Sequence, residues 1–314
     1  MKGTVILTVE EAQQNPERWN EMRNTGIGGT DISSIVGQNK WKSALVLWEE
    51  KTGRRLPKDL SDNEAVYWGK VHEANCATRF EELTGKKVRR CGTLQDEEYP
   101  FILANIDRWV VGENAGLEIK TANGFAGDEW VDDEVPDAYY LQCQWYMMVT
   151  GAERWYICCL IGGNHFVWKE IERQDGLIED LRREAIEFWT KNVQGDVKPE
   201  IDGSDSTSES IAEKYPSSNG METALPMRAQ ALLEEYDRQK ALESCAKERK
   251  SACENALKEL MGSFEVGTYQ DRKVTWKEQA GKITCDMKKL QAHYPDAYAV
   301  CAKVGKPFRK FSVK

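Results

Sequence analysis

Two acidic residues and one lysine have the types and spacing that metal-dependent phosphodiester hydrolysis needs. The apolar run of residues 101–106 ends at Asp107. Glu118 and Lys120 alternate with Leu117 and Ile119 in a later run that is also expected to form a strand. Side chains of a strand alternate between its two faces, so Glu118 and Lys120 share a face, and Asp107 can join them from the end of the preceding strand. Carboxylate oxygens are ligands for Mg²⁺, and a lysine ammonium can orient and polarise an attacking water.

A fourth charged residue is a candidate for the same site. Residues 68–85 predict a helix of about four turns that ends at Gly85, and Glu73 lies beside its apolar stripe. Glu73 could therefore reach a site above the sheet. The alternative for Glu73 is a solvated helix face, and the alternative for Glu118 and Lys120 is an ordinary ion pair on an exposed strand.

A glycine-rich segment suggests a phosphate site. Residues 26–30 read Gly-Ile-Gly-Gly-Thr, and Thr30 is a suitable N-cap for a short helix that ends near Gly37. Backbone N–H groups at a helix N-terminus suit a phosphate, and Arg23 could add a charge-assisted pair of hydrogen bonds. The alternative is a flexible turn before a packing helix, and the sequence favours neither.

The elements around these residues predict a mixed α/β domain. A helix is expected at residues 136–151, followed by strands at 155–161 and 165–171 and a long amphipathic helix at 175–192. The first of these helices carries two glutamines, Gln142 and Gln144. They lie about 200° apart around a helix, so at most one of them can address the site.

Composition restricts the location and the partners of the protein. The nine cysteines lack Cys-x-x-Cys spacing, which predicts reduced thiols, and no apolar run is long enough to cross a membrane. With no secretory signal at the start, we expect a cytoplasmic protein. The net charge of −9 argues against non-specific coating of DNA, so a DNA enzyme of this composition must confine its positive field to one groove.

Charge and composition also divide the chain. Residues 201–220 are rich in Asp, Ser, Gly and Pro and predict a linker after a domain of residues 1–200. Residues 221–314 carry 18 Lys and Arg against 13 Asp and Glu, a net charge of +5. This helical and hairpin region could serve oligomerisation, a DNA channel or partner docking, or it could be a packing buttress.

Five segments occur in a characteristic order: residues 23–31, residues 68–73, Asp107, residues 118–120 and residues 139–151. Their order and spacing resemble the phage lambda-type exonucleases, in the YqaJ-like viral recombinase group of the PD-(D/E)XK nuclease superfamily. Each motif alone is weak, and the five together are specific. One departure is that Ile106 stands before the aspartate, where the superfamily is named for a proline.

The resemblance implies a fold and a metal site. The expected fold is α/β, with a restriction-endonuclease-like mixed central sheet flanked by helices and a small C-terminal α+β tail. Asp107, Glu118 and Glu73 would hold Mg²⁺, for which Mn²⁺ could substitute. Lys120 and Gln144 would orient the nucleophilic water.

The resemblance also implies a reaction and partners. Arg23, Thr30 and Gly28 would hold the 5′ phosphate of linear double-stranded DNA, which the family digests from 5′ to 3′. The resulting 3′ overhang would pass to a single-strand annealing protein, and the enzyme would be a homo-oligomer such as a trimeric ring in a phage-carrying bacterial host. The alternatives are a structure-selective endonuclease or the opposite polarity on the same fold, and a non-catalytic DNA-binding adaptor.

Overall fold

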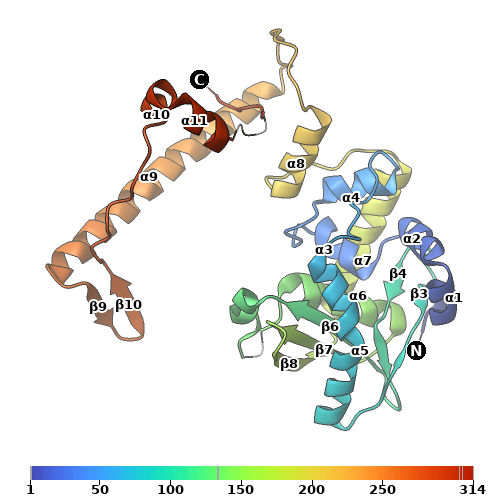
Figure 1. The fold of residues 1–314 in the computed structure, drawn as a ribbon. Helices are drawn as coiled ribbons and strands as arrows, with labels where there is room; N and C mark the ends of the chain where they lie inside the picture. The colour runs from blue at the N-terminus through green and yellow to red at the C-terminus, as the bar shows by residue number, and fades with distance from the viewer. Residues whose placement is uncertain (1, 133, 304, 306, 314) are drawn as a thin grey trace. The chain divides into compact units, whose positions relative to one another are not determined.

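A five-stranded mixed sheet of order β2-β5-β6-β7-β8 organises the first of two structural units, Met1–Tyr215 (Figure 1). The computed structural model describes residues 2–132, 134–303, 305 and 307–313. Within the sheet, β6 runs parallel to β7 and the other neighbouring pairs are antiparallel. The strands are β2 (Val88–Arg90), β5 (Arg108–Val110), β6 (Ala115–Ala122), β7 (Arg154–Ile161) and β8 (His165–Glu172).

A second, antiparallel sheet of order β1-β3-β4 lies in the same unit. The chain leaves β4 after Asn105 and enters the five-stranded sheet at Arg108, so Asp107 lies at the junction between the two sheets. The strands are β1 (Thr4–Leu7), β3 (Thr93–Gln95) and β4 (Leu103–Asn105).

Helices cover both faces of the five-stranded sheet, which confirms the expected fold class. Helix α5 (Glu64–Thr84) packs on one face, where Phe80, Leu117 and Tyr156 share an apolar cluster. Helix α6 (Asp137–Thr150) packs on the other face, and α3 and α7 lie against it (Figure 1). The other helices of this unit that precede α8 are α1 (Val9–Gln14), α2 (Pro16–Asn24), α3 (Gly29–Ile35), α4 (Ala44–Lys51), η1 (Gly124–Trp130), α7 (Asp175–Glu187) and η2 (Phe188–Gln194).

Helix α8 (Asp205–Lys214) occupies half of the segment that was predicted to be a linker, residues 201–220. Ser206, Thr207 and Ser210 of α8 form a buried polar seam with Ser43 and Glu49 at α4, so the serine-rich composition reflects helix packing. The contacts are Ser43 N to Ser206 Oγ (3.1 Å), Thr207 Oγ1 to Ser43 Oγ (2.9 Å) and Ser210 Oγ to Glu49 Oε2 (2.7 Å).

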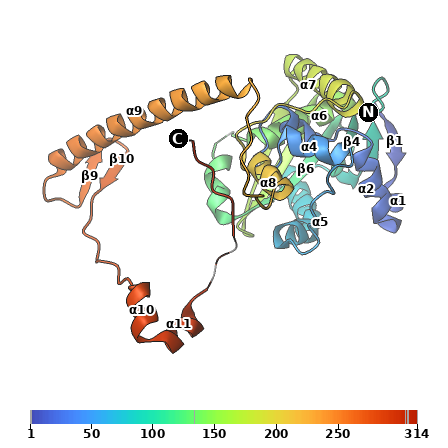
Figure 2. The same cartoon turned by 90° about the horizontal axis from the view of Figure 1, so that it is seen from above.

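The second unit, Pro216–Lys314, begins with the long helix α9. Two short helices follow the hairpin, because Pro295 starts a second one, and residues 309–313 form no strand. Figure 2 shows the hairpin and the two short helices after α9. The elements are α9 (Ala229–Met261), β9 (Val266–Tyr269), β10 (Arg272–Thr275), α10 (Met287–His293) and α11 (Pro295–Cys301).

Over the part of the chain that the structure describes, no helix combines the length and the apolar composition that a membrane span requires. Even α9, with 33 residues, is interrupted by charged side chains throughout.

Close packing inside the sheet gives a first prediction. A Cβ atom at Gly116 of β6 would lie 2.2 Å from the Trp155 ring, whereas a Cβ at Gly176 of α7 meets nothing within 4 Å. We expect Gly116→Ala to lower the free energy of unfolding by about 1–3 kcal/mol, as overpacked cores do. Gly176→Ala should leave it unchanged or raise it, because alanine favours helices. Chemical denaturation measures both, and equal stabilities would contradict the packing described.

Candidate active site

Strand β6 and the junction before β5 bring together the three residues predicted to do chemistry. Glu118 and Lys120 lie on the face of β6 that α6 covers, with 2.6 Å between Glu118 Oε1 and Lys120 Nζ. Asp107 Oδ2 accepts a hydrogen bond from the backbone N–H of Ile119 at 2.8 Å, which ties the junction to β6. The expected grouping of these side chains is therefore present in the structure, and their catalytic roles stay predictions.

Gln142 of α6 completes this cluster. Its Nε2 donates to Glu118 Oε1 and to Tyr146 Oη, each at 2.8 Å, and its Oε1 accepts from Lys120 Nζ at 3.0 Å. One amide therefore holds the carboxylate and the ammonium at the same time. Because the amide carries both a donor and an acceptor, it satisfies both charged groups in a buried place.

Gln144 points away from the cluster, so the prediction that it addresses the site is wrong. Its Nε2 donates to the carbonyl of Glu172 at 2.8 Å, and its Oε1 accepts from the backbone N–H of Gln174 at 3.0 Å. Gln144 is fully buried and links α6 to the end of β8. The physical reason is the half-turn between the two glutamines, which allows only Gln142 to face β6.

The electrostatics of the cluster favour an added positive charge. Burial raises the pKa of Asp107 well above its usual range, and the neighbouring Glu118 carboxylate raises it further. Burial likewise raises the pKa of Glu118. Burial alone would lower the pKa of Lys120, but the Glu118 and Asp107 carboxylates outweigh it and raise that pKa, so the ammonium stays charged. The ring of Tyr139 lies 4.6 Å from Lys120 Nζ.

One oxygen of this site is left without a partner. Glu118 is 3% exposed, and within the described residues its Oε2 has no hydrogen-bond partner. A buried carboxylate oxygen is costly to leave unpaired. Glu118 Oε2 and the nearby carboxylate of Asp107 are suitable ligands for a divalent cation that prefers oxygen.

Glu73 approaches the site but is bound to an arginine that the sequence analysis missed. Arg108 Nη1 lies 2.5 Å from Glu73 Oε1 and 2.7 Å from the carbonyl oxygen of Asp107. The Arg108 side chain is only 7% exposed, and a charged residue inside an apolar strand directly after Asp107 was the available signal. Across the described residues, no three His, Cys, Asp or Glu side chains are placed to hold a metal ion together. The expected set of three carboxylate ligands is thus not assembled, because Glu73 pairs with Arg108.

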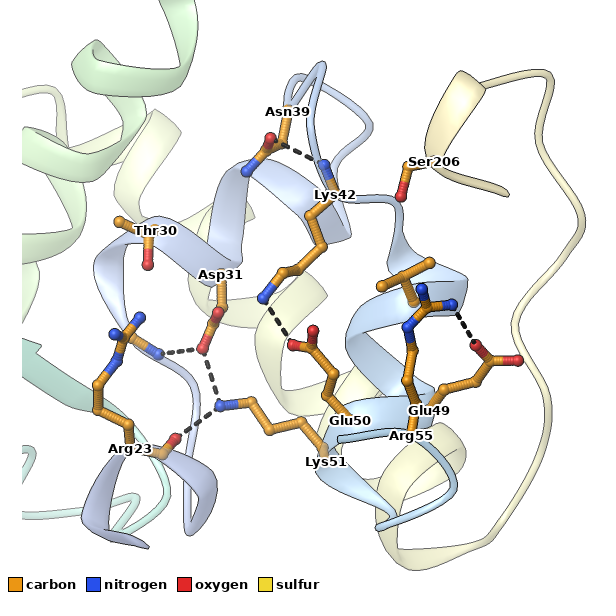
Figure 3. Close-up of polar contacts among 12 residues, drawn as sticks. Arg23, Thr30, Asp31, Asn39, Lys42, Glu49, Glu50, Lys51, Arg55 and Ser206 are labelled. Carbon is orange, nitrogen blue, oxygen red and sulfur yellow. Dashed lines mark hydrogen bonds and ion pairs between the residues drawn. The ribbon is translucent and has the colours of Figure 1, made fainter. Parts of the chain in front are cut away.

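The glycine-rich segment leads into α3, but Thr30 is not its N-cap. Helix α3 starts at Gly29 after the N-cap Gly28, and Asp31 Oδ2 accepts from the backbone N–H of Gly28 at 3.0 Å. Thr30 is therefore an exposed residue of the first turn, because the Asp31 carboxylate performs the capping. Figure 3 shows Arg23, at the end of α2, pointing toward Asp31 with Thr30 nearby on α3.

A close approach of two helices joins this segment to the cluster of Asp107, Glu118, Lys120 and Gln142. A Cβ atom at Gly29 would lie 2.7 Å from Tyr146 Cε1 and 3.0 Å from Gln142 Cγ, so only glycine allows α3 to pack this closely on α6. Ile27 is also bound to the segment that leads toward Asp107, through its N–H to the carbonyl of Phe101 at 2.6 Å. The candidate phosphate segment and the carboxylate cluster thus share one wall.

Comparison with known proteins assigns the family. Residues 18–153 match the YqaJ-like viral recombinase domain. The chain is 39% identical over 316 residues to the uncharacterized protein YqaJ of Bacillus subtilis (strain 168), covering 98% of this chain and 97% of that protein. The chain belongs to the YqaJ-like viral recombinase family. The family resemblance noted in the sequence is thereby confirmed.

Solved structures share the fold of this YqaJ-like protein. The alkaline exonuclease LHK-Exo from Laribacter hongkongensis has a TM-score of 0.51 at 20% identity, over 57% of this chain and 93% of that chain. Its complex with dAMP has the same TM-score at 21% identity, over 64% and 98%. A shorter similarity of 34% identity over 73 residues, 23% of this chain and 21% of that protein, links it to protein D345L of African swine fever virus (isolate Tick/South Africa/Pretoriuskop Pr4/1996).

The buried carboxylates of this YqaJ-like protein predict a dependence of stability on pH. Because the pKa of Asp107 is raised on folding, the folded protein holds a proton that the unfolded chain releases, and stability falls as pH rises through the raised value. In EDTA, Asp107→Asn should flatten this decline and raise the Tm by about 2–4 °C at the neutral end of the pH range. Calorimetry across the acid-to-neutral range measures it, with the exposed Asp62→Asn as control. Parallel curves for wild type and Asp107→Asn would contradict the electrostatics described.

Proposed function

We propose that this protein is a metal-dependent exonuclease that digests linear double-stranded DNA from 5′ to 3′ and leaves 3′ overhangs. The observation that carries the proposal is the buried Glu118, whose unpartnered Oε2 lies in one cluster with Asp107 and Lys120. Membership of the YqaJ-like viral recombinase family supports it, and so does a fold shared with an alkaline exonuclease.

Asp107 and Glu118 would hold the cation, Mg²⁺ or in its place Mn²⁺. When bound, the ion would supply charge neutralisation and Lewis-acid activation at the phosphodiester. Lys120 keeps its proton, so it acts as a hydrogen-bond donor that orients the water and stabilises charge on the phosphate, and not as a base. Gln142 takes the place that Gln144 was predicted to fill, because it fixes Lys120 and Glu118 relative to each other. Glu73 as a third ligand stays a prediction.

The 5′ end of the substrate would be held at the start of α3. The backbone at Gly28, the exposed Thr30 and the guanidinium of Arg23 lie beside the wall that α3 and α6 share. A phosphate held there would present the terminal nucleotide to the cluster, which is the physical basis for a 5′ polarity.

The proposal extends to partners. The 3′ overhang would be passed to a single-strand annealing protein in the host cytoplasm, and the protein would act as a homo-oligomer such as a trimeric ring. The net charge of +5 on residues 221–314 suits contact with DNA or with an acidic partner surface. The roles of oligomerisation, channel and docking for this region stay predictions.

Glu118→Gln and Lys120→Met test the chemistry. Each should lower Mg²⁺-dependent digestion of linear duplex DNA by about a thousandfold, because each removes a group that acts on charge at the reacting phosphate. Release of acid-soluble nucleotide measures the rate, beside an EDTA control and the exposed variant Glu97→Gln. Retained activity in a folded Glu118→Gln protein would rule out this site as the nuclease centre.

The two glutamines give a matched pair of variants. Gln142→Ala should lower kcat by about 10–100-fold, since residues that orient metal ligands have effects of this size. Gln144→Ala should lower the Tm, because it leaves the buried carbonyl of Glu172 unpaired, while kcat of the folded protein stays near the wild-type value. The reverse pattern would show that Gln144 serves the reaction after all.

A further inference from the structure

A buried ion pair lies directly behind the candidate phosphate site. Lys51 Nζ, on the last turn of α4, is 2.9 Å from Asp31 Oδ2, and the two side chains are only 5% and 8% exposed (Figure 3). Within the described residues, no hydrogen bond or ion pair joins either side chain to the cluster around Glu118. A buried ion pair is weak evidence for stability on its own, because desolvation offsets most of its attraction. We therefore expect a role of this pair other than stabilisation of the fold.

The Lys51–Asp31 pair connects the end of α2 to the start of α3. Lys51 Nζ donates to the carbonyl of Arg23 at 2.6 Å, in the last turn of α2. Asp31 Oδ2 accepts from the N–H of Gly28, the N-cap of α3. The two side chains therefore fix both ends of the turn over residues 24–28, which sets the position of Arg23 relative to the start of α3.

The charges around Asp31 leave a net positive charge at Arg23. Lys51 lies beside the carboxylate of Asp31, and the Arg23 guanidinium points toward it (Figure 3). A third nearby cation, Lys42, is paired with Glu50. Burial alone would raise the pKa of Asp31, but Lys51 and then Arg23 outweigh it and lower that pKa, so the carboxylate stays ionised. Asp31 neutralises one of the two cations, and the remaining positive charge is available at the more exposed Arg23.

We propose that Asp31 and Lys51 are positioning residues that hold Arg23 for a terminal 5′ phosphate. This inference rests on the proposed function, in which Arg23 is the phosphate ligand. Lys51 fixes the Arg23 backbone, and Asp31 orients the guanidinium and prevents repulsion between the two cations. The pair acts through Arg23, so it governs preference for a phosphorylated end and not the hydrolytic step.

The test measures binding of blunt duplex DNA whose 5′ ends carry either phosphate or hydroxyl, by fluorescence anisotropy in EDTA. The quantity of interest is the ratio of the two dissociation constants. This ratio is the Kd for the hydroxyl end divided by the Kd for the phosphate end. Arg23→Ala, Asp31→Asn and Lys51→Met should each lower it by about tenfold, the equivalent of one charge-assisted hydrogen bond. Ser210→Ala breaks the α8 seam behind α4 and should leave the ratio unchanged, which controls for loosening of α4.

The double variant Asp31→Asn/Lys51→Met separates positioning from stability. Each single variant leaves one buried charge without its partner and should lower the Tm, whereas removal of both charges should restore most of it. If the pair positions Arg23, the double variant regains stability and still lacks the preference for phosphate. Recovery of both the Tm and the ratio would show a merely structural pair and overturn the inference.

The outcomes distinguish this inference from the function on which it rests. If Arg23→Ala narrows the ratio while Asp31→Asn and Lys51→Met keep it, Arg23 binds phosphate and the positioning role is wrong. If Arg23→Ala leaves the ratio unchanged, both the phosphate site and its positioning pair are wrong. Because binding is measured without hydrolysis, a failure of the nuclease chemistry leaves this comparison readable.

Discussion

The burial of Glu118 against α6 is the constraint on which the rest of the site depends. A carboxylate at 3% exposure needs partners for its charge, and Lys120 and Gln142 both act on the same oxygen, Oε1. Its other oxygen has no partner among the described residues, and the pKa of the nearby Asp107 is raised because burial and the Glu118 carboxylate disfavour its charged form. Attraction for a cation is therefore built into the folded chain, at a cost to the stability of the cation-free form.

Helix α6 contacts both the Glu118 cluster and α3, where the 5′ phosphate is proposed to bind. Gly29 lets α3 approach Gln142 and Tyr146, so the turn that carries Arg23 and the amide that fixes Lys120 are held by one helix. Across that turn, Lys51 of α4 reaches the carbonyl of Arg23. A DNA end placed at α3 and a phosphodiester placed at β6 would thus be fixed by a continuous set of packed elements.

Strand alternation was sufficient to predict the shared face of Glu118 and Lys120, and the run before Asp107 predicted its place at a strand end. The choice between Gln142 and Gln144 could not be made from the sequence. Residues Leu141–Thr150 of α6 are all buried, so the helix has no polar stripe to show which side faces the sheet.

Other features depend on tertiary contacts that local patterns do not encode. Thr30 is a favourable N-cap by type, but the Asp31 carboxylate caps Gly28 instead while it also binds Lys51. Serine-rich α8 has the composition of a linker and is ordered by its polar seam with α4. Arg108 is buried inside a strand because Glu73, from a distant helix, neutralises it.

The most direct measurement uses one linear duplex, labelled either at its 5′ or at its 3′ end, with Mg²⁺ and with EDTA. We predict immediate release of the 5′ label as mononucleotide in Mg²⁺, retention of the 3′ label on a strand that shortens from its 5′ end, and no release in EDTA. Prompt release of the 3′ label would contradict the 5′-end site. Absence of release with any divalent metal, while DNA still binds, would contradict the enzymatic role of the Asp107–Glu118 site.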